Sequence, residues 1–184
     1  MIAMPARTEE THGDPDGART GVLAIAWHAL GNVMDPEVPV VSIVELGIVR
    51  DVAVVNETLV VTLTPTYSGC PATELIGGAV RAALCDAGIE EYRVEYRLAP
   101  AWTTDWLAPE ARERLREYGI APPGGPARID VRGISPLRRA SVPVPCPRCG
   151  SHHTTLLSQF GSTACKAHYR CADCLEPFEY FKPH

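Results

Sequence analysis

The sequence predicts an α/β (α+β) protein in which a small mixed sheet of about three strands packs with helices, followed by a four-cysteine zinc-ribbon module. Two observations favour this fold. Helical and strand periodicities alternate in the order α-β-β-α-β-α up to about residue 119, and two C-x-x-C pairs stand near the end of the chain. A length of 184 residues suits one such domain and one small module.

Composition and charge narrow the class of protein. Hydrophobic residues make up 46% and charged residues 21% of the chain, as in a globular protein. A net charge of −5 argues against a nucleic-acid binder, and no apolar run approaches the roughly 18 residues of a transmembrane helix. The polar N-terminus lacks the order of a signal peptide, so we expect a cytoplasmic protein with no membrane partner. Its seven cysteines then indicate metal or thiol chemistry rather than disulfides.

The N-terminal region is expected to change from disorder to helix. Residues 1–17 contain nothing that can pack, and we expect them to be disordered. Apolar residues then recur at helical spacing over 19–34. This helix must stop before Asp35-Pro36, because proline disfavours a helical conformation in the residue that precedes it.

The next elements complete a small sheet covered by helices. Two runs rich in valine, isoleucine and leucine, 48–55 and 59–64, predict a β-hairpin. A second helix follows Pro71, and alternation over 92–98 predicts a third strand that is reached by a right-handed crossover. The proline that begins 109–118 predicts a third helix there.

Composition also suggests the domain limits. A proline- and glycine-rich stretch, 121–145, predicts a linker, although Ile129-Asp130-Val131 could still pair as a short strand. The expected organisation is therefore a tail over 1–17, an α/β domain over 18–120, this linker, and a ribbon over 146–184.

Two C-x-x-C pairs predict a metal site formed by Cys146, Cys149, Cys171 and Cys174. Each pair can fold as a knuckle, and four thiolates complete the tetrahedral ligand set of structural Zn²⁺. Iron in the same thiolates and an unmetallated thiol pair are the alternatives. A module of about 40 residues buries too little core to fold alone, so we expect the metal to stabilise it.

A fifth cysteine, Cys165, lies between the two pairs, as do His152, His153 and His168. Because four sulfurs fill a zinc site, we expect the histidines to be exposed polar residues. Cys165 is next to Lys166, a cation that favours a thiolate, and is therefore a candidate additional thiol. The alternative is that Cys165 is a small core residue.

Cys70 lies where the second predicted strand meets the second predicted helix. Because Pro71 suits the first helical position, we expect Cys70 to cap the helix N-terminus, where free N–H groups and the helix dipole lower the pKa of a thiol. Thr73 would then reach the sulfur. Such a thiol is a nucleophile or a metal ligand, and the alternative is a buried cysteine in a turn. Cys85 is expected to be structural.

Four stretches carry a resemblance to known families. DPEVPVVSIVELGIVRDV (35–52), TPTYSGCPAT (64–73) and WTTDW (102–106) resemble the signatures of the SufT-like iron–sulfur assembly domain. The tail, which runs from CPRCGS through FGSTACKA to CADCLEPF within 146–178, is similar to that of the PaaD family. The resemblance covers about residues 20–184 apart from the linker.

The resemblance implies a role in aerobic phenylacetate degradation, beside an oxygenase with a di-iron core and a reductase that carries flavin and a [2Fe–2S] cluster. Proteins of this kind are thought to assist the maturation of a metal centre rather than to catalyse the epoxidation. Cys70 would then contact transient iron or an iron–sulfur cluster, with Asp35, Glu37 and Thr73 lining the same site. The implied partners are the oxygenase subunits, their reductase and iron–sulfur assembly proteins.

The leading hypothesis is a non-catalytic maturation factor of phenylacetyl-CoA epoxidase, in which Cys70 accepts iron or a cluster and the ribbon recognises the client protein. A structural subunit that binds the oxygenase stably, with no chemistry at Cys70, is the alternative. A thiol enzyme acting on a small thioester is a third hypothesis. It needs a base near Cys70, and the nearest histidine in the sequence is His28.

Overall fold

The computed structural model describes residues 15–67, 69–124 and 144–183. Most of the expected disordered tail and the candidate strand at 129–131 lie outside the described residues. The expectation of disorder is wrong at its last three positions, because helix α1 (Pro15–Gly31) begins there. Proline lacks the N–H that the first helical turn leaves unpaired, so a helix can begin at Pro15.

Helix α1 ends at Gly31 rather than at residue 34. The N–H of Asn32 donates to the carbonyl of Ala29, and the N–H of Val33 donates to that of Leu30. Both hydrogen bonds join residues that are three positions apart, as in a 3-10 helix, rather than four as in an α-helix. They tighten the backbone into a turn and end the α-helix before Asp35.

The predicted hairpin is confirmed as strands β1 (Val49–Val55) and β2 (Thr58–Leu63), which pair antiparallel. Asn56 and Glu57 connect them with φ angles of 49° and 66°. Two consecutive left-handed residues form the turn whose twist matches that of the flanking strands.

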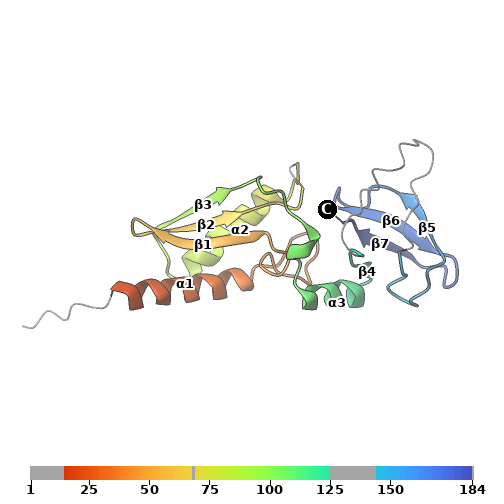
Figure 1. Cartoon of the computed structure of the whole chain (residues 1–184), viewed down its shortest axis with the longest axis horizontal. Helices are drawn as coiled ribbons and strands as arrows, with labels where there is room; N and C mark the ends of the chain where they lie inside the picture. Colours follow the sequence, from red (N-terminus) through yellow and green to blue (C-terminus); the bar gives the residue numbers. More distant parts are fainter. Residues whose placement is uncertain (1–14, 68, 125–143, 184) are drawn as a thin grey trace, which may run out of the picture.

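The rest of the α/β domain also follows the predicted order. Strand β3 (Tyr92–Tyr96) pairs parallel with β2 after helix α2 (Thr73–Asp86), which makes the sheet order β1-β2-β3. A short 3-10 helix, η1 (Thr104–Trp106), precedes α3 (Pro109–Tyr118). Helices α1 and α2 contact each other and pack on the sheet (Figure 1).

The C-terminal sheet is built from β5 (Thr154–Ser158), β6 (Lys166–Cys171) and β7 (Pro177–Phe181). A fourth strand, β4 (Ile120–Ala121), directly follows α3 and pairs parallel with β7, so that the order is β4-β7-β6-β5. Figure 1 shows α3 and β4 between the first sheet and the three ribbon strands. The expected domain limits stay predictions. The residues that directly follow α3 already belong to the ribbon sheet, because they form β4.

Two hydrophobic clusters form the core, and the larger one joins both parts of the chain. Ribbon strands and knuckles bury the smaller cluster: Ala121, Val144, Cys146, Ala167, Tyr169, Cys171 and Phe178. Cys165 and Phe181 also come from the ribbon, yet they are buried in the larger cluster with the helices and sheet of the α/β domain. The two parts therefore share a packed interface. No helix among the described residues is long and apolar enough to cross a membrane.

Candidate metal sites

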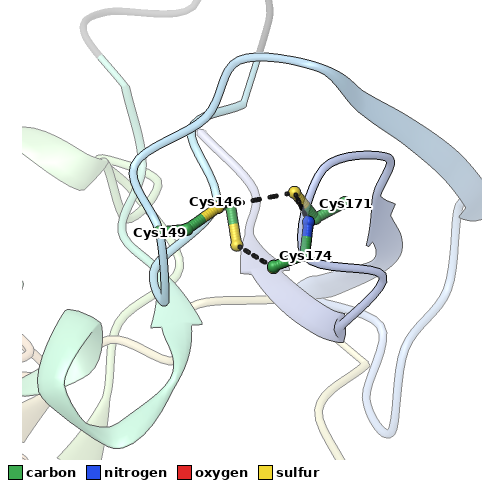
Figure 2. Close-up of side chains that lie close together, drawn as sticks. All are labelled: Cys146, Cys149, Cys171 and Cys174. Atoms are coloured by element: carbon green, nitrogen blue, oxygen red, sulfur yellow. Dashed lines mark hydrogen bonds between the residues drawn. The ribbon is translucent and has the colours of Figure 1, made fainter.

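The four predicted zinc ligands converge on one point (Figure 2). All four sulfurs lie within 4.8 Å of one another. The distance between the Sγ atoms of Cys146 and Cys174 is 3.7 Å, and that between the Sγ atoms of Cys149 and Cys171 is 3.6 Å. A tetrahedral zinc ion with Zn–S bonds of about 2.3 Å would separate its sulfurs by about 3.8 Å. The donor set therefore fits Zn²⁺.

The backbone of each knuckle turns so that both sulfurs face this point. The residue after each pair is left-handed: Gly150 has a φ of 74° and Leu175 a φ of 64°. In the second knuckle, the N–H of Cys174 donates to the Sγ of Cys171 at 3.5 Å. This bond is the main cause that lowers the pKa of Cys171 to about 7, which favours the thiolate that a metal needs.

A second candidate site lies at the interface between the α/β domain and the ribbon. It is a cavity of about 20 Å³ whose polar wall contains Asp35, Glu37, Cys70 and Cys165. Thr66 and apolar residues complete the lining: Val38, Leu46, Ile48, Pro65, Ile76 and Phe181. The structure therefore brings three of the four residues predicted for iron transfer together, and adds the additional thiol.

Asp35 and Glu37 enter the cavity from one turn. The Oδ1 atom of Asp35 accepts the N–H of Glu37 at 2.9 Å and the N–H of Val38 at 2.8 Å. Asp35 is 7% exposed, and its burial raises the pKa of its carboxyl group against the opposing effect of these two bonds. Burial and the neighbouring Asp35 carboxylate also raise the pKa of Glu37.

The expectation that Cys70 caps helix α2 with a lowered pKa is wrong. The N-cap is Ala72, and Thr73 is the first helical residue. Burial raises the pKa of Cys70, and this is the largest effect on the thiol. The hydrogen bond with the Ala72 backbone lowers the pKa by a smaller amount, whereas the Glu37 and Asp35 carboxylates raise it further. The favourable helix terminus lies two residues further along the chain, so desolvation and two acidic neighbours dominate at the sulfur.

Thr73 holds the turn that carries Cys70 and does not line the cavity. Its Oγ1 donates to the Cys70 carbonyl oxygen at 2.8 Å, and its N–H approaches the same oxygen at 3.2 Å. The Thr73 side chain also lowers the pKa of the Cys70 thiol, but by less than burial raises it. The role predicted for Thr73 therefore becomes one of positioning the thiol.

Cys165 reaches the cavity from the start of β6. It is 7% exposed, and Thr163 Oγ1 lies 3.0 Å from its sulfur. Burial raises its pKa, which contradicts the expectation that Lys166 favours a thiolate; Lys166 lowers the pKa less than burial raises it. Lys166 is directed to another partner, because its Nζ pairs with Glu179 at 2.8 Å.

A wider open hollow of about 360 Å³ lies beside this cavity. Glu37 lines both spaces, and Lys166, Glu179 and His168 line the hollow only. Sequence patterns contain no signal for the Lys166–Glu179 pair or for Phe181 at the cavity, because each residue can be placed only after the ribbon has docked. No histidine lines the cavity among the described residues, so the base that a thiol enzyme needs is not found there.

Comparisons with known proteins identify both parts of the chain. Residues 133–182 match the family model of the PaaD zinc beta ribbon domain, and residues 24–95 match that of an iron-sulfur cluster assembly protein. A relative from Escherichia coli, named as a putative subunit of 1,2-phenylacetyl-CoA epoxidase, is 54% identical over 158 residues, which span 85% of this chain and 90% of the relative. The chain belongs to the PaaD family. The four ribbon cysteines are thus the metal-binding group of a PaaD zinc ribbon.

Two further similarities concern the α/β domain of this PaaD-family chain. An Fe-S protein maturation auxiliary factor from Porphyromonas gingivalis is 33% identical over 88 residues, which span 47% of this chain and 83% of that protein. The crystal structure of a domain of unknown function, DUF59, from Bacillus anthracis is 29% identical, with a TM-score of 0.50. It covers 54% of this chain and 96% of that domain, and it supports the α/β fold.

Proposed function

We propose that this PaaD-family protein is an auxiliary maturation factor of the phenylacetyl-CoA epoxidase system in aerobic phenylacetate degradation. It assists the assembly of an iron or iron–sulfur centre in the oxygenase or in its flavin and [2Fe–2S] reductase. The relatives support this proposal, one by its name as an epoxidase subunit and one by its name as a maturation factor. The observation that carries it is the placement of Cys70 beside Asp35 and Glu37 in one cavity.

The chemistry of this wall suits iron as a cargo. Iron(II) accepts both thiolate and carboxylate ligands, and Cys70, Asp35 and Glu37 supply both kinds. Burial raises the pKa of all three groups, which means that their charged forms are disfavoured at this site. An incoming cation would stabilise the charged forms. The proposal locates this exchange in the cytoplasm, where thiols stay reduced.

Zn²⁺ in the ribbon has a structural role in this proposal. Cys146, Cys149, Cys171 and Cys174 would hold it, and it supplies the stability that so small a module cannot obtain from its own core. The rigid ribbon recognises the client protein and, through Cys165 and Phe181, closes the cavity of the α/β domain.

A stably bound structural subunit of the oxygenase is the second candidate. The ribbon exposes large apolar side chains in and after β5, with Leu156 40%, Leu157 56% and Phe160 65% exposed. Such side chains can anchor a partner protein. In this case Cys70 has no chemical role, and the complex with the oxygenase survives washing at high salt.

The Cys70→Ala variant separates the two candidates in cells that grow on phenylacetate. A maturation factor predicts loss of phenylacetate-dependent oxygenase activity, with the oxygenase or its reductase accumulating short of iron. Cys85→Ala is the matched control, because Cys85 is an exposed thiol on α2 that does not line the cavity. Normal iron loading and full activity with Cys70→Ala would refute the maturation role and favour the structural subunit.

A further inference from the structure

We propose that the zinc ribbon controls access to the candidate site at Cys70, so that the cavity is complete only while the metal keeps the ribbon folded. Loss of zinc then uncovers Cys70, although the metal ligands and the cavity share no residue. This inference rests on the proposed function only for the role of Cys70.

Strands β6 and β7 form a hairpin that runs from the metal ligands to the cavity (Figure 1). Strand β6 ends at Cys171, Cys174 lies in the turn, and β7 follows that turn. At the other end of the hairpin, Lys166 pairs with Phe181. The five residues of β7 span about 17 Å, at about 3.4 Å per residue. Two of the metal ligands therefore lie at the turn of a hairpin whose open end is about 17 Å away.

The open end of this hairpin is the part of the ribbon that faces Cys70. Cys165 directly precedes β6, Phe181 ends β7, and both line the cavity. The N–H of Lys182 donates to the Cys165 carbonyl at 2.9 Å and holds the two strand ends together. Cys165 and Phe181 are both buried in the core of the α/β domain. This wall of the cavity therefore stays in place only while the hairpin is formed.

The hairpin depends on the metal because the ribbon has a small core of its own. Two residues of the smaller buried cluster, Cys146 and Cys171, are themselves metal ligands. A module of about 40 residues buries too little apolar surface to fold alone, and the binding free energy of a structural zinc ion is folding free energy. Without the metal, the turn of the hairpin loses the interaction that fixes it. Cys165 and Phe181 are then released from the cavity wall.

The first knuckle is also fastened to the α/β domain. Arg148 lies between Cys146 and Cys149, and its guanidinium group lies against Gly119, the residue that caps α3. A Cβ atom at position 119 would come within 2.8 Å of Arg148 Nη2, so a glycine leaves room for this contact. The metal ligands are therefore joined to the α/β domain by two routes, one at α3 and one at the cavity.

A coupling between two sites acts in both directions. If the zinc-bound ribbon stabilises the cavity wall, contacts at the wall also stabilise the zinc-bound ribbon, and their loss weakens zinc binding. Phe181 lines the cavity, packs against Trp102 and is not a metal ligand. A lower zinc affinity of a Phe181 variant therefore measures the coupling rather than a change in the ligand set.

The first experiment removes zinc from the unchanged full chain with a chelator, under reducing conditions, and measures iodoacetamide labelling by peptide mass spectrometry. Zinc removal should raise the labelling rates of Cys70 and Cys165 by at least about fivefold each, and added Zn²⁺ should reverse the change. Cys85 is the matched control, because it is an exposed thiol that does not line the cavity, and its rate should stay the same.

Three results of this experiment would overturn the proposal. An unchanged rate at Cys70 would show that the ribbon does not control access to it. An unchanged rate at Cys165 would show that the wall stays in place without zinc. An equal rise at Cys85 would show that the whole chain unfolds when the metal is removed.

The second experiment measures the zinc affinity of Phe181→Ala by competition with a coloured chelator. The affinity should fall by at least about fivefold. Phe160→Ala is the matched control, because Phe160 is an exposed ribbon phenylalanine, and its zinc affinity should equal that of the unchanged protein. An unchanged affinity of Phe181→Ala would refute the coupling. If this variant fails to fold, the labelling of the unchanged protein still decides. The Cys70→Ala cell experiment tests the maturation role separately, so the failure of one proposal is distinguishable from that of the other.

Discussion

The rings of Trp102 and Phe181 pack together with centroids 5.9 Å apart and planes inclined at 53°. Trp102 belongs to the α/β domain, where its Nε1 donates to the Leu46 carbonyl at 2.8 Å, and Phe181 ends the last ribbon strand. Leu46 and Phe181 both line the cavity that contains Cys70. This contact therefore joins the two parts of the chain and holds Phe181 in place at the wall of the candidate transfer site.

Phe181→Ala should loosen this interface. Phe181 is 2% exposed, and the loss of a buried phenylalanine costs about 3–5 kcal/mol, including the cavity that it leaves. We expect a lower urea midpoint and faster alkylation of Cys165. Phe160→Ala is the control, because Phe160 is 65% exposed and should change stability by less than about 1 kcal/mol. Equal effects of the two variants would contradict the packed interface.

Loss of a knuckle thiolate should release the metal and unfold the ribbon. Zinc sites of this kind contribute apparent free energies of roughly 10–16 kcal/mol, so Cys171→Ser should lose zinc in elemental analysis. Limited proteolysis should then cut within 144–183 and leave 20–118 intact. Cys85→Ser, which changes an exposed thiol, should keep its zinc. A Cys171→Ser protein that keeps both metal and protease resistance would remove Cys171 from the ligand set.

The Lys166–Glu179 ion pair should make stability depend on pH. Burial tends to raise the pKa of Glu179, but hydrogen bonds from Lys166 and the Ser162 N–H outweigh it and hold the pKa below 4.5. The ionised carboxylate therefore stabilises the fold above pH 4.5, and this contribution is lost as the pH falls through the depressed pKa.

Glu179→Gln should consequently lose about 1.5–3 kcal/mol at pH 7, since a charged hydrogen bond is removed beside the buried Lys166. The difference from the unchanged protein should shrink as the pH falls below 4.5. Urea unfolding between about pH 7 and pH 3 measures it, with the exposed Glu117→Gln as control. A difference that stays constant with pH would rule out the ion pair as its source.

Leu175→Gly should stabilise the ribbon. Leu175 is 60% exposed and left-handed, a conformation that costs a residue with a Cβ atom about 1–2 kcal/mol. Glycine removes this strain, but it also gives the unfolded chain more conformational freedom, which opposes folding. The net increase in the free energy of unfolding should be about 0.5–1 kcal/mol. Gly150→Leu, at the equivalent position of the first knuckle, should lose a similar amount. Thermal unfolding tests both, and a destabilised Leu175→Gly would show that the leucine side chain outweighs the strain.

Alkylation should proceed at Cys85 before Cys70. Cys85 is exposed, whereas Cys70 is half-buried and has a raised pKa, and alkylation requires an accessible thiolate. Cys165 should react last of the three, since it is buried and its pKa is also raised. Peptide mass spectrometry after partial reaction with iodoacetamide measures the order. If Cys70 reacts first, its pKa is lowered rather than raised, as expected for a thiol at a helix N-cap.

Much of the fold can be predicted because the relevant interactions are local. The hairpin around Asn56 and Glu57 and the helix from Pro109 to Tyr118 follow from turn residues, alternation and helix punctuation. The error at Cys70 also has a local origin. Pro71 suits the first helical position, but the helix begins two residues later, and this shift separates the sulfur from the helix N-terminus.

The sequence by itself determined the order of the main helices and strands and the two C-x-x-C knuckles, and its resemblance to a known family pointed to Asp35, Glu37 and Cys70, which line the cavity. Only the tertiary structure decided that Cys165 completes that wall and that β4 joins the ribbon sheet. Residues that lie within one turn, such as Asp35 and Glu37, or within a C-x-x-C knuckle are close in the sequence, so their spacing along the chain already predicts that they lie together. A contact between Cys70 and a distant ribbon depends on how apolar surfaces such as Trp102 and Phe181 pack, and sequence periodicity carries no record of that docking.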